Sequence, residues 1–167
     1  GTTLPYILDK YFSDRSEEFK EMVTRESMDF EQKMPFPPVP GAMEFIHLLK
    51  GKGVKVGLVT SSDNAKLERA FRLLKLDNLF DTVVSADRIT KGKPDPMCYQ
   101  LAASDLHVSP ADCLVFEDSF AGIQAGTNAG MRVIGLSTTN SEESLKDKVY
   151  QVIPDFQNIT FEDYQKW

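Results

Sequence analysis

Two adjacent carboxylates, Glu117 and Asp118, follow the short apolar run 114–116. Such a run between turn residues is typical of a buried strand in a parallel sheet, and ligands bind at the carboxyl ends of those strands. Mg²⁺ prefers hard oxygen ligands, and takes one or two carboxylates together with waters and a substrate phosphate. The pair therefore predicts a Mg²⁺ site, although an acidic pair before a helix also acts as a helix cap.

A cluster of polar residues follows the apolar run 54–59. It contains Thr60, Ser61, Ser62, Asp63 and Asn64. Hydroxyls and backbone N–H groups at the start of a helix form an anion site. The alternative is an ordinary helix N-cap, which residues of these types form more often.

The loop Lys-Gly-Lys-Pro-Asp-Pro over 91–96 holds Lys93 between a glycine and a proline. Most loop lysines are solvated, but these neighbours fix the backbone and suit a lysine held in a defined place. The polar cluster, Lys93 and the carboxylate pair all follow strands, so they should meet at one edge of a parallel sheet. A hydrogen-bond donor, a fixed cation and a metal site together predict chemistry on a phosphoryl group.

The elements that must position these residues change character along the chain. Apolar residues over 4–34 have helical spacing, with a break at 13–14, and the proline-rich segment 34–41 cannot continue a helix. From residue 42 helices and strands alternate, which indicates βαβ units and a parallel sheet. We therefore expect an α/β fold, with a small helical cap over 1–36 and a Rossmann-like core over 37–167. The expected core helices are 42–50, 65–74, 97–106 and 120–129, and the strands are 54–59, 82–85, 114–116, 132–136 and 149–153.

Composition limits the class of protein. The chain has 167 residues, 41% of them hydrophobic, and a net charge of −6, so it lacks the basic surface that nucleic acid requires. No apolar run reaches the length of a membrane span, and two cysteines are too few for a disulfide framework. We expect no membrane partner and a cytoplasmic location.

Three segments resemble a known family. VGLVTSS (56–62), KGKPDP (91–96) and VFEDSFAGIQAGTNAGM (115–131) are similar to the second, third and fourth motifs of the haloacid dehalogenase-like hydrolase superfamily. The similarity is strongest to the branch with a small helical cap, which holds sugar-phosphate phosphatases and β-phosphoglucomutases. It implies that Thr60 binds the transferring phosphoryl group and that Lys93 neutralises its charge. It also implies that Glu117 and Asp118 hold Mg²⁺, and that Ser61, Ser62 and Asn64 bind the substrate.

One motif of that superfamily is missing. Its members begin with a strand ending in Asp-x-Asp, whose first aspartate is the nucleophile, and no Asp-x-Asp occurs among these 167 residues. The resemblance places that strand between the strand ending at Thr60 and the strand ending at Phe116. We therefore expect an interrupted sheet, completed by a missing N-terminal segment or a swapped copy, and no activity from the chain as written.

The resemblance implies a Mg²⁺-dependent phosphatase for a small phosphorylated metabolite such as a sugar phosphate, acting through an aspartyl-phosphate. One alternative is a β-phosphoglucomutase-like phosphosugar mutase. Another, of a different class, is a non-catalytic protein that binds a phosphorylated ligand or a partner. For the fold itself, we expect Phe116 and Phe120 in the core, and His47 and His107 either at the surface or hydrogen-bonded. We also expect Gly122, Gly126 and Gly130 to allow close packing of their helix on the sheet.

Overall fold

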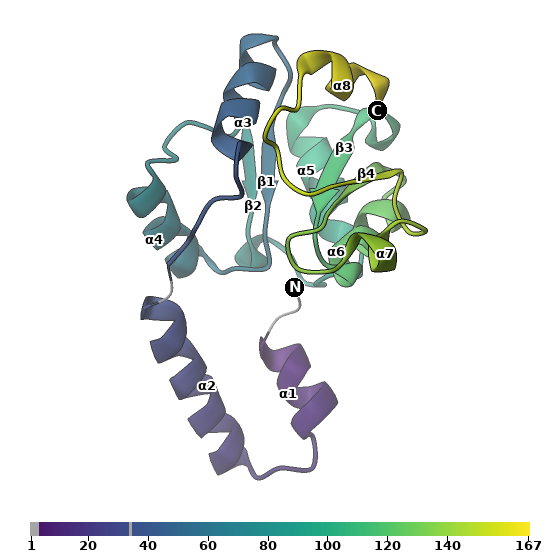
Figure 1. Ribbon diagram of the computed structural model, residues 1–167. Helices are drawn as coiled ribbons and strands as arrows, with labels where there is room; N and C mark the ends of the chain where they lie inside the picture. Colours follow the sequence, from purple (N-terminus) through teal and green to yellow (C-terminus); the bar gives the residue numbers. More distant parts are fainter. Residues whose placement is uncertain (1–3, 34) are drawn as a thin grey trace.

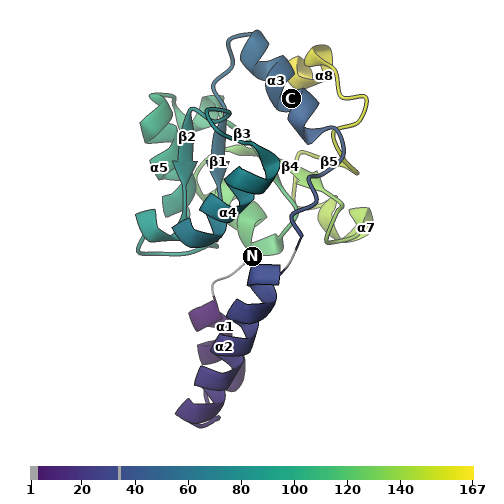
Figure 2. The same ribbon diagram turned by 90° about the vertical axis from the view of Figure 1, so that its left-hand side faces the viewer.

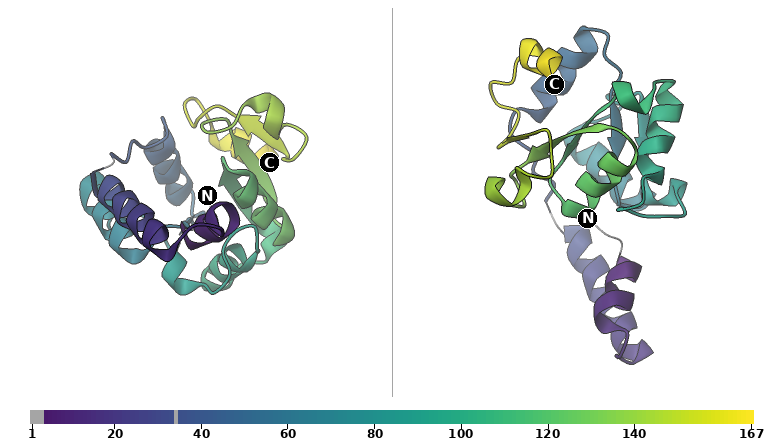
Figure 3. Two further views of the ribbon diagram at one scale, coloured as in Figure 1. Left: turned by 90° about the horizontal axis from the view of Figure 1, so that it is seen from below. Right: turned by 90° about the vertical axis from the view of Figure 1, so that its right-hand side faces the viewer.

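Two helices, α1 (Leu4–Phe12) and α2 (Glu17–Lys33), precede the core in the computed structural model, which describes residues 4–33 and 35–167. They lie side by side and extend away from the core (Figures 1 and 3). The Phe12 and Phe19 rings hold them together, with centroids 5.8 Å apart. The break expected at 13–14 is confirmed. Residues 1–3 and 34 of the predicted cap lie outside the described residues, and its boundary at 36 stays a prediction.

From Ala42 onward helices and strands alternate, as expected. Every predicted core element is present, with some ends shifted: the first strand begins at Gly57 rather than residue 54. The short helices α7 and α8 were not predicted. The core elements are α3 (Ala42–Gly51), β1 (Gly57–Val59), α4 (Asn64–Leu74), β2 (Thr82–Val84), η1 (Ala86–Arg88), α5 (Met97–Leu106), η2 (Pro110–Asp112), β3 (Leu114–Glu117), α6 (Phe120–Asn128), β4 (Arg132–Leu136), α7 (Glu142–Leu145), β5 (Gln151–Ile153) and α8 (Phe161–Lys166).

The strands form two separate parallel groups. β1 pairs with β2, and β4 lies between β3 and β5. Within the described part of the chain β1 and β3 pair neither with each other nor with a strand between them. The interruption falls where the family resemblance implied it, between the strands that lead to Thr60 and to Glu117.

Helix α5 shows that the two groups run in the same direction. Near its start, Tyr99 OH donates a hydrogen bond to the side chain of Glu117, the last residue of β3. At its end, Leu106 accepts a hydrogen bond from Lys55 Nζ, just before β1. Both strands therefore run antiparallel to α5, and their carboxyl ends lie at the same edge of the molecule.

Helices cover both faces of the strands. Helices α5 and α6 pack on one face, where the buried side chains include Tyr99 and Ile123. Helices α3 and α8 pack on the other (Figure 2), where the Phe116 ring lies 5.8 Å from that of Phe45 and 5.8 Å from that of Trp167. Phe116 belongs to the core as expected. The prediction for Phe120 is wrong: at the first turn of α6 it is 44% exposed.

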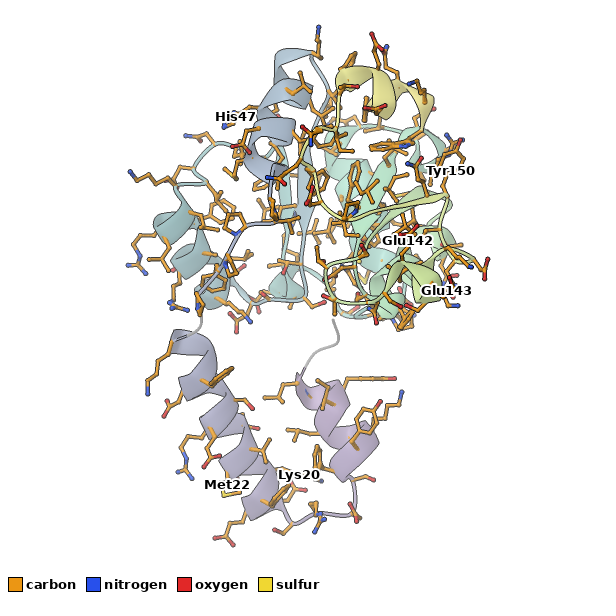
Figure 4. The ribbon with its side chains drawn as sticks, in the orientation of Figure 1. Lys20, Met22, His47, Glu142, Glu143 and Tyr150 are labelled. Atoms are coloured by element: carbon orange, nitrogen blue, oxygen red, sulfur yellow. The ribbon has the colours of Figure 1, made fainter. Side chains whose placement is uncertain are left out.

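The remaining expectations concern small groups. His47, on the outer side of α3 (Figure 4), and His107 are both exposed. Both cysteines are free thiols, Cys98 buried and Cys113 half-buried. Among residues 4–33 and 35–167, no helix combines the length and the apolar character that crossing a bilayer requires.

Candidate active site

A buried ion pair lies at the carboxyl end of β3. Lys93 Nζ donates a hydrogen bond to Glu117 Oε1, and the side chains are only 5% and 8% exposed. Tyr99 OH donates to the same oxygen at 2.6 Å, and its ring centroid lies 5.1 Å from Lys93 Nζ. The sequence predicted a lysine in a defined place, and the structure brings it onto one of the two predicted metal ligands. Tyr99 was not predicted, because its place on α5 gave no sign that it faces a carboxylate.

Burial, charge and hydrogen bonds set the protonation states of Glu117 and Tyr99. Burial by itself would raise the pKa of Glu117, but the charge of Lys93 and the hydrogen bonds from Lys93 and Tyr99 outweigh it and lower that pKa. Burial, together with the charge of Glu117, raises the pKa of Tyr99, so its phenol remains a neutral donor. The cluster therefore holds Glu117 as an ionised carboxylate at neutral pH.

The start of α6 holds the other oxygen of Glu117. Ser119 Oγ donates to Glu117 Oε2 at 3.1 Å and accepts from the N–H of Gly122 at 3.1 Å, which caps the helix. A β-carbon on Gly122 would lie 2.1 Å from the Glu117 carboxyl carbon. A β-carbon on Gly126 would lie 2.9 Å from the Val133 side chain. The close packing predicted for Gly122 and Gly126 is confirmed, and at Gly122 the group it admits is the Glu117 carboxylate. The prediction is wrong for Gly130, where nothing lies within 4 Å of an added β-carbon.

Asp118 is held by the loop that follows β4. Its Oδ2 accepts hydrogen bonds from Thr139 and, at 3.4 Å, from Thr138, while Asn140 Nδ2 donates to its carbonyl at 2.7 Å. None of these bonds involves Oδ1. Sequence reasoning missed this loop, although Ser-Thr-Thr-Asn directly after an apolar strand is the same signal that identified the cluster at Thr60.

The cluster after β1 lies at the same edge but on the other side of the interruption. Thr60 Oγ1 accepts from the N–H of Ser62 at 3.1 Å, and the Asn64 N–H donates to Asp87 at 2.7 Å. Asp63 caps α4 by accepting from the N–H of Lys66, so the N-cap alternative is true for Asp63. Within the described part of the chain, no hydrogen bond joins Thr60, Ser62 or Asn64 to Lys93, Glu117 or Asp118.

The two carboxylates at the end of β3 fit a Mg²⁺ ion whose remaining ligands are waters and a phosphate. Among the described residues no three His, Cys, Asp or Glu side chains are grouped to enclose a metal. Two adjacent carboxylates remain, which is the number of protein ligands that Mg²⁺ commonly takes beside waters and phosphate. Because Lys93, Tyr99 and Ser119 occupy both oxygens of Glu117, Oδ1 of Asp118 is the oxygen better placed to bind a cation.

Known proteins are similar to this chain in sequence. The family model described as haloacid dehalogenase-like hydrolase matches residues 1–136. A validoxylamine A 7′-phosphate phosphatase from Streptomyces hygroscopicus subsp. limoneus is 42% identical over 109 residues, which are 65% of this chain and 51% of that protein. The β-phosphoglucomutase of Bacillus subtilis is 37% identical over 123 residues, 71% of this chain and 54% of that protein. The chain thus spans about half the length of these two relatives.

A solved structure extends the similarity to the fold. The crystal structure of a haloacid dehalogenase family IA hydrolase from Entamoeba histolytica superposes with a TM-score of 0.84 and 25% sequence identity, over 98% of this chain and 77% of that one. The α/β fold, the cap helices and the three motifs agree with this relationship. The chain therefore belongs to the haloacid dehalogenase-like hydrolase family, in the branch that carries a cap and includes β-phosphoglucomutases.

Proposed function

We propose that this chain carries most of the active site of a Mg²⁺-dependent phosphatase for a small phosphorylated metabolite such as a sugar phosphate. The observation that carries the proposal is the buried Lys93–Glu117 pair beside Asp118, at the carboxyl end of β3. A fixed positive charge and a divalent metal stabilise the charge that develops on a transferring phosphoryl group. The phosphatase relative from Streptomyces supports the same reaction class.

In this proposal each cluster has one task. Thr60 and the N–H groups that follow it bind the oxygens of the phosphoryl group, since they stand at the start of α4. Lys93 faces the same group with its positive charge, and Ser61, Ser62 and Asn64 contact the rest of the substrate. The pair Glu117 and Asp118 would hold Mg²⁺ with Asp118 Oδ1 as the direct ligand and Glu117 beside it, and the ion supplies Lewis-acid stabilisation of the phosphoryl oxygens when bound. The reaction would proceed through an aspartyl-phosphate. The aspartate that forms it belongs to the Asp-x-Asp motif, which does not occur among these 167 residues.

Two other functions remain to be tested. A phosphosugar mutase uses the same chemistry with a sugar hydroxyl as acceptor, and the 37% identity to a β-phosphoglucomutase favours it. A non-catalytic protein would use Thr60 and Lys93 to bind a phosphorylated ligand without turning it over.

The test uses the protein expressed from its complete gene, with a panel of sugar phosphates that includes β-glucose 1-phosphate. We expect inorganic phosphate as the product with Mg²⁺ present and none with excess chelator. An isomeric sugar phosphate as the main product would instead establish the mutase. Binding without turnover of any member of the panel would support the non-catalytic protein.

Variants then test the site itself. Asp118→Asn should lower the Mg²⁺-dependent rate about a hundredfold or more, because it removes a charged ligand of the metal. Asp112→Asn is the matched control: this exposed aspartate lies just before β3, at the opposite end of the strand, and its substitution should leave the rate unchanged. Equal rates for both variants would show that Asp118 is not a metal ligand, and would support its alternative role as a helix cap.

A further inference from the structure

A loop outside the three motif segments, residues 137–141, joins β4 to α7. In the parallel pair of β3 and β4, Glu117 lies opposite Gly135, so the chain leaves both strands at the same edge of the sheet. The N–H of Ser137 donates to the carbonyl of Ile153 at 3.0 Å, which ties the start of the loop to β5. The loop therefore begins from a fixed point close to the residue that follows Glu117.

The loop contacts Asp118 on both its main chain and its side chain. Asn140 Nδ2 donates to the Asp118 carbonyl at 2.7 Å, which holds the backbone of this residue. The Thr139 hydroxyl donates to Oδ2 of the carboxylate, and the Thr138 hydroxyl donates to the same oxygen at 3.4 Å. The two kinds of contact together fix both the position of Asp118 and the direction in which its carboxylate is turned. Oδ1 takes part in none of these bonds.

The orientation of this carboxylate matters for a small cation. The last side-chain torsion of an aspartate has a broad energy profile, so a carboxylate without hydrogen bonds turns readily. Mg²⁺ requires near-octahedral geometry, with its ligands at about 2.0–2.1 Å. Hydrogen bonds from neighbouring groups orient metal ligands, and their loss typically lowers metal affinity about 10- to 100-fold. The hydroxyls on Oδ2 hold the Asp118 carboxylate in one orientation, as a Mg²⁺ ligand requires.

The two carboxylates are held by groups of different kinds. Buried side chains, Lys93 and Tyr99, donate to Glu117, so replacing either of them also disturbs the core. The hydroxyl that donates to Asp118 belongs to Thr139, which is exposed. A substitution in the loop therefore changes what orients Asp118 and leaves the packing of the core intact.

We propose that Thr139 and Asn140 are positioning residues of the metal site, which hold Asp118 so that its Oδ1 meets the cation. They act through Asp118 and do not bind the cation themselves. The inference rests on the proposed function, since it requires Asp118 to bind Mg²⁺. It adds a fourth segment of the chain to the site, after the cluster at Thr60, the loop with Lys93 and the carboxylate pair.

Metal binding to the protein expressed from its complete gene tests this inference. The probe is Mn²⁺, which suits the same oxygen ligands as Mg²⁺ and whose free concentration is measured by electron paramagnetic resonance. The ion to be followed is the one whose binding Asp118→Asn abolishes. Thr139→Val removes the hydroxyl from a side chain of the same shape and should raise the Kd of this ion about tenfold or more. Thr139→Ser keeps the hydroxyl and should bind the ion nearly as tightly as the unsubstituted protein.

Two more variants complete the set. Asn140→Leu removes the contact to the Asp118 main chain and should also raise the Kd about tenfold. Thr127→Val is the matched control, because this exposed threonine lies in the last turn of α6, at the far end of that helix from Asp118. It should leave the Kd unchanged.

Turnover gives a second measurement on the same variants. Thr139→Val should raise the Mg²⁺ concentration that gives half of the maximal rate about tenfold, while the KM for the sugar phosphate at saturating Mg²⁺ stays unchanged.

The outcomes separate the inference from the proposed function. A Thr139→Val protein with the Kd of the control would overturn the inference. So would a Thr139→Ser protein that binds Mn²⁺ as weakly as Thr139→Val, because the hydroxyl would then not be what orients Asp118. If the unsubstituted protein has no Mn²⁺ site that depends on Asp118, the metal site of the proposed function is itself contradicted, and the inference with it.

Discussion

At the scale of single residues, the ion pair of Lys93 and Glu117 matters most, because it buries two charges away from water. Both charges are removed from water, and each is stable there only because the other is present. Replacing one partner leaves an uncompensated buried charge, which typically costs about 3–5 kcal/mol. The pair should therefore affect stability as well as catalysis.

Substitution of Lys93 tests this view. Lys93→Met should lower the free energy of unfolding by about 3–5 kcal/mol, measured by urea denaturation. Adding Glu117→Gln should recover much of the loss, because no buried charge is then left alone. Lys91→Met, in the exposed part of the same loop, is the control and should change stability by less than about 0.5 kcal/mol. A Lys93→Met variant as stable as the control would mean that water reaches the pair.

Tyr99 carries a second residue-scale prediction. Tyr99→Phe removes the 2.6 Å hydrogen bond to Glu117 and leaves the ring in place, so it should destabilise the fold by about 1–3 kcal/mol. Tyr150→Phe is the matched control, since Tyr150 is 57% exposed at the outer side of the core (Figure 4). The same urea titration compares the two. Equal effects would show that the Tyr99 hydroxyl contributes nothing beyond a surface phenol.

At the scale of elements, the first turn of α6 must come close to the end of β3. Gly122→Ala would normally stabilise a helix by about 1 kcal/mol, but here the new carbon would overlap the Glu117 carboxylate. We expect a net loss of about 1–3 kcal/mol in the free energy of unfolding, as in other overpacked sites. Gly51→Ala at the end of α3, where nothing lies within 4 Å, should instead be neutral or stabilising. A stabilised Gly122→Ala variant would show that Glu117 can move aside without loss.

Asp81 connects the start of β1 to β2 and gives a prediction about pH. Its Oδ2 accepts from the Val56 N–H at 2.8 Å and its Oδ1 from Lys50 Nζ at 3.0 Å, and these contacts lower the pKa of Asp81 below the usual 3.8. A lowered pKa stabilises the folded state fully above about pH 4, and the stabilisation is lost as the pH falls through the folded-state pKa.

Asp81→Asn should therefore lose roughly 1 kcal/mol relative to the unsubstituted chain at pH 7, since the side chain is partly exposed and screened. The difference should shrink as the pH falls below 3.8 and through the lowered folded-state pKa of Asp81. Thermal unfolding between pH 2 and pH 7 measures it. A difference that stays constant over this range would mean that the charge of Asp81 does not matter.

At the scale of the whole molecule, the chain holds charge stabilisers on both sides of an interrupted sheet but no Asp-x-Asp motif. We expect the chain 1–167 to release no phosphate from any sugar phosphate that the product of the complete gene hydrolyses. Covalent catalysis requires its nucleophile, and charge stabilisation alone leaves a small residual effect. Phosphate release assayed side by side on the two proteins measures this, and clear turnover by the chain 1–167 would contradict it.

The sequence by itself determined the order of elements and the positions that carry chemistry. Alternating apolar runs and helical spacings over 42–136 specify parallel βαβ units because hydrophobic periodicity is a local property. Local sequence patterns also predicted that Thr60, Lys93, Glu117 and Asp118 lie at strand ends or in the loops that follow. They failed for Phe120, because the side of a helix that meets the sheet depends on how the helix packs.

Only the tertiary structure decided which of these residues meet. Lys93 and Glu117 form a buried pair because α5 and α6 pack against β3, and the same packing brings Tyr99 onto the carboxylate. The loop after β4 reaches Asp118 because parallel strands end at one edge. Thr60 lies on the other side of the sheet's interruption from this group, since no ladder of hydrogen bonds joins β1 to β3 in the described part of the chain. Contacts between distant segments depend on packing in three dimensions, and no local pattern encodes them.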